Sequence, residues 1–391
     1  MPAVHATPHA STVLVVGGGT SGAALTILLR QRGIEVELVE AKADWNVYGS
    51  GITLQGNALR VLRELGVWDE IRAHGYAFDS VGIVAPDGTE LFVQNDARTG
   101  GPDLPATLGM QRPDLQRILV EAVRATGARC RLGCTVESLT QDGSGVDVRF
   151  TDGSTGRYDL VAAADGLHSA TRALIGVPDK PVPTGMGIWR TPAPRPAGVV
   201  RTNLAYGGPC FIAGYCPTGQ DTIYAYLVEP RRERASIDPE KKAEEMRRLA
   251  EGYGGAWDEI REHILDSEQV NYTWFDRLLV EGPWHRGRVV LVGDAAHACP
   301  PTLAQGAAMS LEDALVLADL LASDADAAGG GSDGETPIDD VLTRYRDRRM
   351  PRVRMVVDNS VQLGQWLLDG IRDADVPGLI GRTMAVLSER P

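Results

Sequence analysis

The most constraining feature of the sequence is a set of spaced glycines between an apolar strand and an apolar helix. The segment STVLVVGGGTSGAALTILLRQRG predicts a strand over 13–16, then Gly17, Gly19 and Gly22, and a helix that ends at Gly33. Gly17 allows a tight turn, Gly19 lets a pyrophosphate approach the backbone, and Gly22 lets the helix pack on the strand. The helix amides then point at the phosphates, so the segment predicts a dinucleotide-binding βαβ unit.

A second strand over 36–39 completes this unit, and Glu40 stands at its carboxyl end. An acid at this distance from the glycines can accept a hydrogen bond from a ribose hydroxyl. The unit therefore predicts a ligand with an ADP moiety. By itself the unit does not distinguish NAD from FAD as this ligand.

Composition excludes several other classes of protein. The 391 residues carry 39 basic and 52 acidic side chains, and this net charge of -13 gives no basic surface for nucleic acid or anionic lipid. There is neither a signal-peptide pattern nor an apolar run long enough to span a membrane, so we expect a cytoplasmic protein. The five cysteines lack paired spacing, which predicts neither a disulfide framework nor a metal site.

The rest of the chain alternates between parallel-sheet and hairpin patterns, which predicts two interleaved lobes. Apolar runs around Asp-Gly turns predict hairpins over 81–93 and 146–161. Between them, apolar residues at helical spacing predict a helix over 112–127. The alternation over 203–230 predicts a second, more antiparallel sheet, which we assign to the substrate.

Two later strands also end in glycine turns. In YDLVAAADGLHSATR a strand ends at Asp165 and Gly166, and the segment is either a ligand-binding turn or a turn capped by Asp165 or Ser169. In RVVLVGDAAHACPPTLAQG a strand ends at Asp294, prolines fix the loop, and a helix begins near Gly306. This second turn suits a flavin, because Asp294 can accept from ribityl hydroxyls while the helix start stabilises negative charge on the reduced ring.

Together these stretches resemble the FAD-dependent group A aromatic monooxygenases, the phenol and salicylate hydroxylase type with a para-hydroxybenzoate hydroxylase fold. The resemblance covers nearly the whole chain and rests on GGGTSG, GSGITLQGNALRVLRELGVWDEI, MQRPDLQRIL, DGLHSATR, GDAAHACPPTLAQGAAMSLEDA and YRDRRMPRVRMVVDNS, in this order. It implies an α/β fold, with a Rossmann-like FAD-binding fold interleaved with a mainly antiparallel-sheet substrate domain and followed by a C-terminal helical tail. The implied boundaries are 10–75, 100–180 and 285–325 for the FAD-binding domain, 76–99 and 181–284 for the substrate domain, and 336–391 for the helical region, after a flexible link over 324–337.

The resemblance implies that NAD(P)H reduces a non-covalently bound FAD, that O2 adds to form a flavin hydroperoxide, and that an electron-rich aromatic ring attacks its distal oxygen. The implied partners are a small phenolic or other aromatic substrate, O2 and NAD(P)H, with no nucleic acid and no membrane, in a monomer or homodimer. Ala41 follows Glu40 where a basic residue is common, so the sequence does not choose between NADPH and NADH.

The resemblance also assigns site residues. Arg190 in GIWRTPAP and Pro300 are the predicted catalytic residues, and the alternative for Arg190 is a surface arginine packed on Trp189. The aromatic residues of the second sheet either line a substrate pocket or belong to its core, and they are Tyr206, Phe211, Tyr215 and Tyr226. The predicted cofactor-binding residues are Gly17, Gly19, Gly22, Glu40, Gly51, Arg112, Asp165, Gly166, Asp294, Gln305 and Gly306.

One departure and two alternatives remain. The usual glycine before Gln305 is replaced here by Ala304, and we expect this change to shift the loop over the flavin slightly.

A flavin oxidase or reductase of the same fold would not insert oxygen, and a non-catalytic dinucleotide sensor need not consume NAD(P)H. A flavin halogenase is disfavoured, because the seven tryptophans form no Trp-x-Trp-x-Ile-Pro stretch. We expect His297 to order its loop and assign it no proton transfer.

Overall fold

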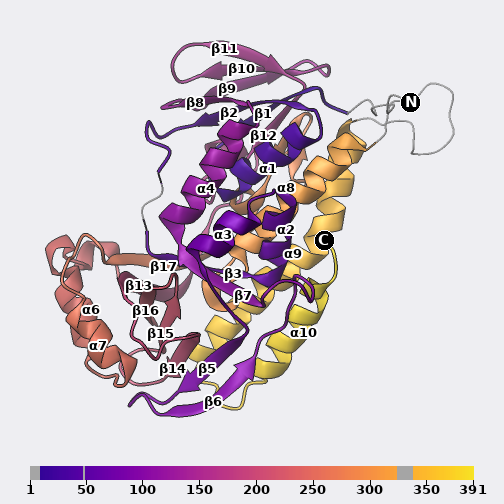
Figure 1. The fold of residues 1–391 in the computed structure, drawn as a ribbon. Coiled ribbons are helices and arrows are strands. Elements are labelled where there is room, and N and C mark those ends of the chain that lie inside the picture. The colour runs from indigo at the N-terminus through magenta and orange to yellow at the C-terminus, as the bar shows by residue number, and fades with distance from the viewer. Residues whose placement is uncertain (1–8, 47–48, 324–337) are drawn as a thin grey trace.

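The computed structural model describes residues 9–46, 49–323 and 338–391, so the predicted link over 324–337 lies outside the described residues. A six-stranded sheet, parallel except at one edge, runs through the part of the molecule that carries the glycine turns (Figure 1). Its strands in spatial order are β18 (His285–Arg286), β19 (Val289–Leu291), β12 (Leu160–Ala163), β1 (Thr12–Val16), β2 (Glu35–Glu40) and β8 (Arg129–Leu132).

The two faces of this sheet are covered differently, as the alternation along β1 shows. Val13 and Val15 belong to the large core made with helices, whereas Leu14 and Val16 pack against a small antiparallel sheet. Both faces are therefore buried, which explains why β1 is apolar from Val13 to Val16. The covering elements are α1 (Thr20–Gln31), α4 (Arg112–Ala125) and α8 (Gly306–Ala322) on one face, and β9 (Val136–Gln141), β10 (Val146–Phe150) and β11 (Thr155–Tyr158) on the other.

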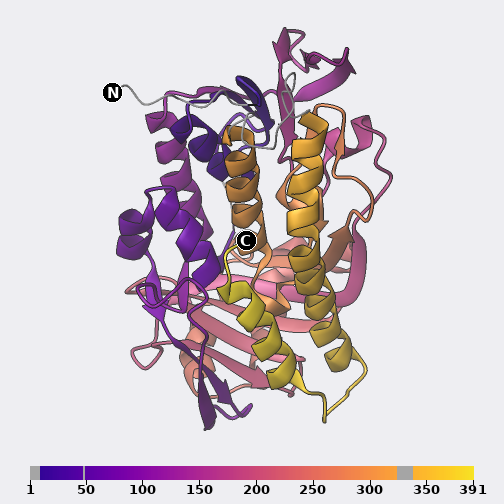
Figure 2. The same cartoon turned by 90° about the vertical axis from the view of Figure 1, so that its right-hand side faces the viewer.

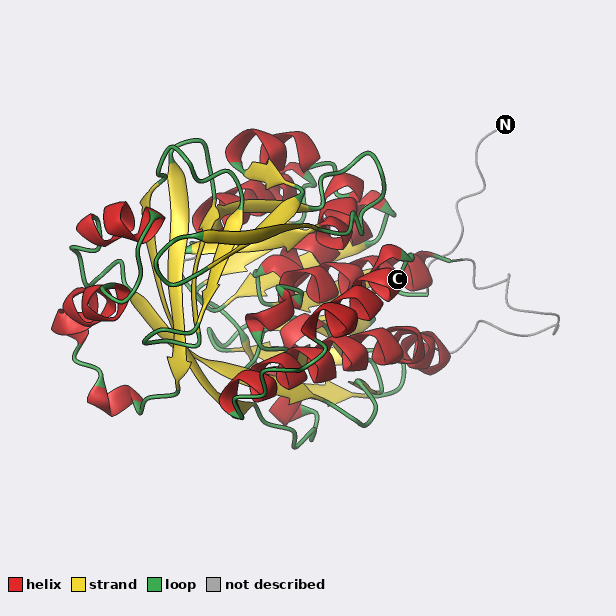
Figure 3. Cartoon of the chain, turned by 90° about the horizontal axis from the view of Figure 1, so that it is seen from below, coloured by secondary structure: helices red, strands yellow, loops and turns green. Residues whose placement is uncertain are grey.

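An eight-stranded sheet, antiparallel except between β14 and β5, forms the second lobe. Its outer face is covered by α6 (Lys242–Ala250) and α7 (Ala256–Glu262), which lie outside the strands in Figure 3. The segment between β16 and α6 holds η1 (Arg234–Ser236) and η2 (Pro239–Lys241). The strands in spatial order are β20 (His297–Ala298), β17 (Asn271–Leu279), β13 (Val182–Pro194), β16 (Thr222–Pro230), β15 (Ile212–Pro217), β14 (Thr202–Tyr206), β5 (Ser80–Val84) and β6 (Glu90–Asn95).

A fourth sheet and several helices complete the described part of the molecule. The sheet has three antiparallel strands, and its central strand leads directly into α4. These elements are β3 (Gly51–Gln55), β7 (Thr107–Gln111), β4 (Tyr76–Phe78), α2 (Gly56–Glu64), α3 (Trp68–His74), α5 (Ala170–Leu174), η3 (Gly293–Ala295) and η4 (Pro301–Leu303).

The chain ends in two helices, α9 (Ile338–Leu368) and α10 (Val376–Ser388). Figure 2 shows α9 standing beside α8, with α10 packed along the lower part of α9. Within the described ranges, no helix combines the length and the apolar character that crossing a bilayer requires.

The predicted fold class is confirmed. The strand before the glycines, the helix after them, both hairpins, the helix over 112–127 and the helix start near Gly306 all form where their patterns predict. The mainly antiparallel sheet takes strands from 80–95, 182–279 and 297–298, so the lobes interleave along the chain. The residue-level domain boundaries stay predictions.

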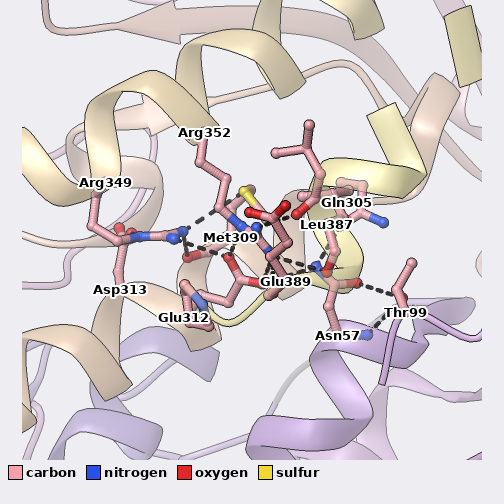
Figure 4. Close-up of polar contacts among 12 residues, drawn as sticks. Asn57, Thr99, Gln305, Met309, Glu312, Asp313, Arg349, Arg352, Leu387 and Glu389 are labelled. Carbon is pink, nitrogen blue, oxygen red and sulfur yellow. Dashed lines mark hydrogen bonds and ion pairs between the residues drawn. The ribbon is translucent and has the colours of Figure 1, made fainter. Parts of the chain in front are cut away.

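Four charged side chains, which we call the α8–α9 ion network, join the last part of the chain to the core (Figure 4). Glu312 and Asp313 on α8 are fully buried, although the helix around them is apolar. Arg349 Nε donates to Asp313 Oδ1 at 2.7 Å, and its Nη1 donates to Glu312 Oε2 at 2.9 Å. Arg352 donates to both oxygens of Glu312 at 2.8 Å. Since a buried charge is tolerated only when it is paired, the network fixes α9 against α8.

The same network holds the end of α10. Arg352 donates to the carbonyl oxygens of Val386 at 2.7 Å and Leu387 at 3.0 Å. Arg60 of α2 donates to the carbonyl oxygen of Glu389 at 2.9 Å. The last carbonyls of a helix lack partners within the helix and carry partial negative charge, so these cations terminate α10 and fix its position.

We expect the substitution Arg349→Met to cost about 3–5 kcal/mol of unfolding free energy, because it leaves two buried carboxylates short of a partner. The matched control is Arg354→Met, which removes an arginine of the same helix from an exposed pair with Glu281 and should cost less than about 1 kcal/mol. Urea denaturation followed by tryptophan fluorescence measures both. Similar midpoints for the two variants would contradict a stabilising role of the network.

Candidate active site

The glycine turn after β1 has the geometry that its spacing predicts. Gly17 has φ +101°, and a Cβ there would lie 2.5 Å from the carbonyl oxygen of Ala164. A Cβ on Gly22 would lie 1.9 Å from the carbonyl oxygen of Gly17, so a side chain at either position would force the turn apart. At Gly19, by contrast, no atom lies within 4 Å of the position that a Cβ would take, and no side chain caps the start of α1. The amides of α1 are therefore open to an anionic ligand.

Glu40 organises this turn from the end of β2. Its carboxylate accepts from the amides of Gly18 at 2.8 Å and Lys42 at 2.9 Å. The carbonyl oxygen of Gly18 in turn accepts from Trp45 Nε1 and from Gln116 Nε2, both at 2.8 Å. The carboxylate is half-buried and has lone pairs to spare, so it can still accept from a ribose hydroxyl.

One cavity of about 910 Å³ connects this turn to the second lobe. It runs from Gly19 at the start of α1, past Asp294 and the start of α8, to the inner face of the eight-stranded sheet and to α10. A volume of this size holds a cofactor ring together with a small substrate. Among the residues that the structure describes, no three side chains of His, Cys, Asp or Glu gather as a metal site.

The turn after β19 brings a second uncapped helix start to the cavity. Gly293 has φ +61°, and a Cβ on it would lie 2.2 Å from Ser21 Oγ, so the turn after β19 touches the turn after β1. Asp294 lines the cavity and is half-buried, and burial raises the pKa of its carboxyl, with His297 and Arg112 acting in the opposite direction. The helix α8 begins at Gly306 without a side-chain cap. Its free amides and Asp294 thus offer donors and an acceptor to one ligand.

His297 serves the loop and not the cavity. Its Nε2 lies 2.6 Å from Asp313 Oδ2, and its ring lies tilted against that of Trp284, with the centroids 5.3 Å apart. The same Asp313 oxygen accepts from the amide of Gly293 at 2.9 Å. Burial alone would raise the pKa of Asp313, but His297 and Arg349 outweigh it and lower the pKa to about 2. The ionised carboxylate therefore clamps the turn that carries Asp294.

The carboxylate of Asp165 is used within its own turn. It accepts a hydrogen bond from the hydroxyl of Ser169. It also accepts from the amide of Thr171 at 3.0 Å and from the hydroxyl of Thr171 at 2.8 Å. Asp165 is not among the cavity-lining residues, whereas Gly166, with φ +78°, is one of them. Of the two alternatives from the sequence, this geometry matches the turn capped by Asp165 or Ser169. The turn presents its backbone at Gly166 to the cavity.

Arg172, just after this turn, ties the two later turns together. Its guanidinium is buried and donates to the carbonyl oxygens of Leu167, Asp179 and Ala295, each at 3.0 Å. Ala295 belongs to η3, next to Asp294. The sequence shows Arg172 only as part of a motif, and nothing local in it predicts the carbonyl partners.

Two arginines face the cavity from different lobes. Arg112 Nε donates to the carbonyl oxygen of Gly51 at 3.3 Å, and Arg190 Nη1 donates to Thr273 Oγ1 at 2.9 Å. Burial lowers the pKa of Arg190 to about 10, and the charge of Arg112 acts in the same direction. Arg190 therefore stays cationic near neutral pH, and with the guanidinium of Arg112 nearby this part of the cavity favours an anionic or electron-rich group.

Tyr224 is a cavity residue that the sequence analysis missed. Its ring stacks on that of Tyr226 with centroids 5.2 Å apart, and its hydroxyl lies 3.3 Å from Thr53 Oγ1. A Cβ on Gly51 would lie 2.1 Å from the Tyr224 ring, so the glycine is what admits the ring. Burial raises the pKa of Tyr224 to about 12, which keeps its hydroxyl a hydrogen-bond donor.

The predicted substrate residues divide between the two faces of the sheet. Tyr206 and Tyr226 line the cavity, whereas Phe211 and Tyr215 do not. Tyr215 pairs in register with Ala225 on the outer face and packs at 6.2 Å from Trp257 of α7. Phe211 packs beside a core cluster under α9. Counting in twos from Tyr226 finds Tyr224, and this alternation is the signal that sequence reasoning had available.

The loop before α8 also divides its predicted residues. Pro300 is buried and is not among the lining residues, but the neighbouring Pro301 is. Gln305 is fully buried, and its Oε1 accepts from Asn57 Nδ2 at 3.0 Å, so its side chain supports the loop from behind. Ala304 lines the cavity with φ 53°, and it is the one non-glycine residue in the described part of the chain with a positive φ.

We expect Ala304→Gly to raise the free energy of unfolding by up to about 1 kcal/mol, because alanine is strained in the left-handed region and glycine is not. The matched control is Ala307→Gly on the helix that follows, where glycine should instead cost about 1 kcal/mol. Thermal unfolding measures both. A loss of stability in Ala304→Gly as large as that of the control would contradict the strain.

Comparison with known proteins relates this site to characterised families. The chain is 31% identical over 363 residues to the aurachin C monooxygenase/isomerase of Stigmatella aurantiaca, an alignment that covers 91% of this chain and 90% of the relative. It is 32% identical over 402 residues to the 3-amino-4-hydroxybenzoate 2-monooxygenase PtnB3 of Streptomyces platensis, covering 95% and 94%. Its fold matches that of Klebsiella pneumoniae HpxO, solved with FAD and uric acid, with a TM-score of 0.82 at 22% identity over 97% of both chains.

The family assignment follows from a match over most of the length. A family model described as an FAD binding domain covers residues 10–360, which include the glycine turn after β1 and the turns that carry Gly166 and Asp294. The cradle of Gly17, Gly19 and Gly22 and the two open helix starts fit such a cofactor. The chain therefore belongs to the FAD binding domain family, and it is a flavoprotein monooxygenase of the group A aromatic hydroxylase type.

Proposed function

We propose that the enzyme hydroxylates a phenolic or other electron-rich aromatic small molecule, with NAD(P)H as reductant and O2 as the source of oxygen. The observation that carries this proposal is the single cavity, which joins the dinucleotide turn and the start of α8 to a wall of aromatic and aliphatic side chains. The relative PtnB3 is named for an aromatic substrate with an amino and a hydroxy group, which supports a substrate of this kind.

For the cofactor, we assign the open amides of α1 beside Gly19 to the pyrophosphate and Glu40 to the adenosine ribose. We assign Asp294 to the ribityl hydroxyls and the start of α8 at Gly306 to the flavin ring. When bound, FAD supplies the redox chemistry that couples oxidation of NAD(P)H to insertion of one oxygen atom. The route of oxygen insertion that the sequence resemblance implies stays a prediction.

The residues of the second lobe would bind and orient the aromatic ring. Arg190 places a buried cation where a phenolate or carboxylate gains most from it, because the attraction between charges is stronger away from water. Tyr224 offers a hydroxyl donor beside it, and the stacked ring of Tyr226 offers an apolar face. The aliphatic wall, including Ile188 and Leu204, excludes water from the reacting atoms.

We expect Asp294→Ala to weaken FAD binding by about one to two decades in Kd, because a hydrogen bond to a charged group contributes roughly 1.5–3 kcal/mol. The control is Asp319→Ala, which removes an exposed carboxylate near the other end of α8. Titration of each apoprotein with FAD, followed by flavin fluorescence, gives both constants. An unchanged Kd for Asp294→Ala would contradict the assignment of this carboxylate to FAD binding.

We expect NAD(P)H oxidation to be slow without substrate and to rise at least about tenfold, or roughly 1.4 kcal/mol of barrier, when the right aromatic compound is added. The reason is that O2 reoxidises reduced flavin and forms peroxide when no substrate is present to accept the oxygen. Reduction that depends on bound substrate avoids this loss of NAD(P)H. A panel of phenols, hydroxybenzoates and hydroxylated N-heterocycles, assayed for NAD(P)H loss, peroxide and product mass, measures this.

The panel also separates the alternatives. A product heavier by one oxygen atom, labelled when 18O2 is supplied, supports the monooxygenase. If every active compound returns all reducing equivalents as peroxide, the oxidase or reductase takes its place. If FAD stays bound and no compound promotes NAD(P)H oxidation, the non-catalytic dinucleotide sensor replaces the monooxygenase.

A further inference from the structure

One acidic side chain of the cavity has no structural task. Asp96 follows the edge strand β6, lines the cavity and is half-buried. The hydrogen bond that its carboxylate accepts comes from Thr107 Oγ1 at a long 3.5 Å. Within the described residues, Asp96 forms no ion pair. A carboxylate in such a place is short of donors, and a ligand in the cavity can supply them.

The neighbouring Asp79 shows what a structural carboxylate looks like in this part of the fold. It accepts from the amide of Ala106 at 2.7 Å and pairs with Arg98 at 2.7 Å. Arg98, the nearest basic residue along the chain, is therefore already paired with Asp79 and not with Asp96. Asp79 adds its own negative charge to the surroundings of Asp96.

The titration of Asp96 agrees with this geometry. Burial raises the pKa of its carboxyl to about 6, the hydrogen bond from Thr107 opposes that shift, and the charge of Asp79 adds to it. Above this pH the group is an anion that faces the cavity without a cation.

Asp96 lies away from the end of the cavity that holds Arg112 and Arg190, which is marked by Gly51. The strands β3 and β7 pair Gly51 with Gln111 and Gln55 with Thr107. Thr107 is the residue that contacts Asp96, and the four steps from Gly51 to Gln55 span about 13 Å at roughly 3.3 Å per residue. The cavity thus has cations at the end near Gly51 and an anion at the other end.

Much of the remaining wall of the cavity is apolar. It includes Leu204, Leu367, Ile371 and Met384, the last three from the C-terminal helices and the loop that joins them. A ligand that fills such a space has an aromatic head, an apolar middle and a positively charged tail.

We propose that Asp96 is a specificity-determining residue that selects aromatic substrates with a protonated amine remote from the ring to be hydroxylated. This inference rests on the proposed function for the identity of the ring, but the amine preference is a property of binding. It is measurable without turnover, so it stands or falls separately from oxygen insertion.

The test uses para-substituted phenols with linear side chains of two to eight carbons that end in an ammonium, a methyl or a carboxylate group. Their Kd values for the FAD-loaded enzyme are read from the change in flavin absorbance, without NAD(P)H. At pH 8 we expect the ammonium compound of the best length to bind at least about tenfold more tightly than its methyl counterpart. We expect Asp96→Asn to abolish this preference.

The matched control is Asp87→Asn, which removes an exposed carboxylate from the turn of the same β5–β6 hairpin and should keep the full preference. A second arm needs no variant, because lowering the pH to 5 protonates Asp96 and should reduce the wild-type preference to below about threefold. Equal affinities of ammonium and methyl compounds at pH 8, or a preference that survives both Asp96→Asn and pH 5, would overturn the inference. Failure to find an oxygenated product leaves these binding outcomes unchanged and counts against the proposed function alone.

Discussion

The rest of the structure depends on the burial of two adjacent carboxylates, Glu312 and Asp313, in the apolar helix α8. Neither can be buried ionised without cations, so Arg349 and Arg352 must come from α9. Asp313 then has an oxygen left for the amide of Gly293 and for His297. A requirement for charge neutralisation in the core thereby fixes the turn that faces the cofactor.

This arrangement gives the cavity a preformed electrostatic gradient. Two open helix starts and the guanidinium groups of Arg112 and Arg190 line the cavity, and in the proposed function they would stabilise negative charge on the flavin and on a phenolate without reorganising. Asp96 is of opposite sign at the far end. If Asp96 has the proposed role, a ligand with both charges would be aligned along the cavity before any chemistry begins.

The sequence predicted what depends on short-range pattern and missed what depends on long-range pairing. The glycine spacing and the strand before it define β1, α1 and their turn because those constraints are local. The face that Tyr215 takes depends on its pairing with Ala225 in another strand. Because alternate residues of a strand point to opposite faces, this pairing places Tyr215 on the face away from the cavity. The partners of Glu312 lie about forty positions away, at Arg349 and Arg352. Buried charges in an apolar helix were the available signal, but they do not name their partners.

The ion network also couples two helices that line the cavity. Arg352 binds Glu312 in α8 and the last carbonyls of α10, while Met384 of α10 and Gly306 of α8 both line the cavity. A movement of α10 must therefore strain or carry along the contacts of Arg352. Because these contacts are buried charge pairs, such a movement is costly unless α8 follows. The positions of α10 and of α8 are thus mechanically linked, and in the proposed function such a link is what an enzyme needs if substrate binding is to control reduction of its cofactor.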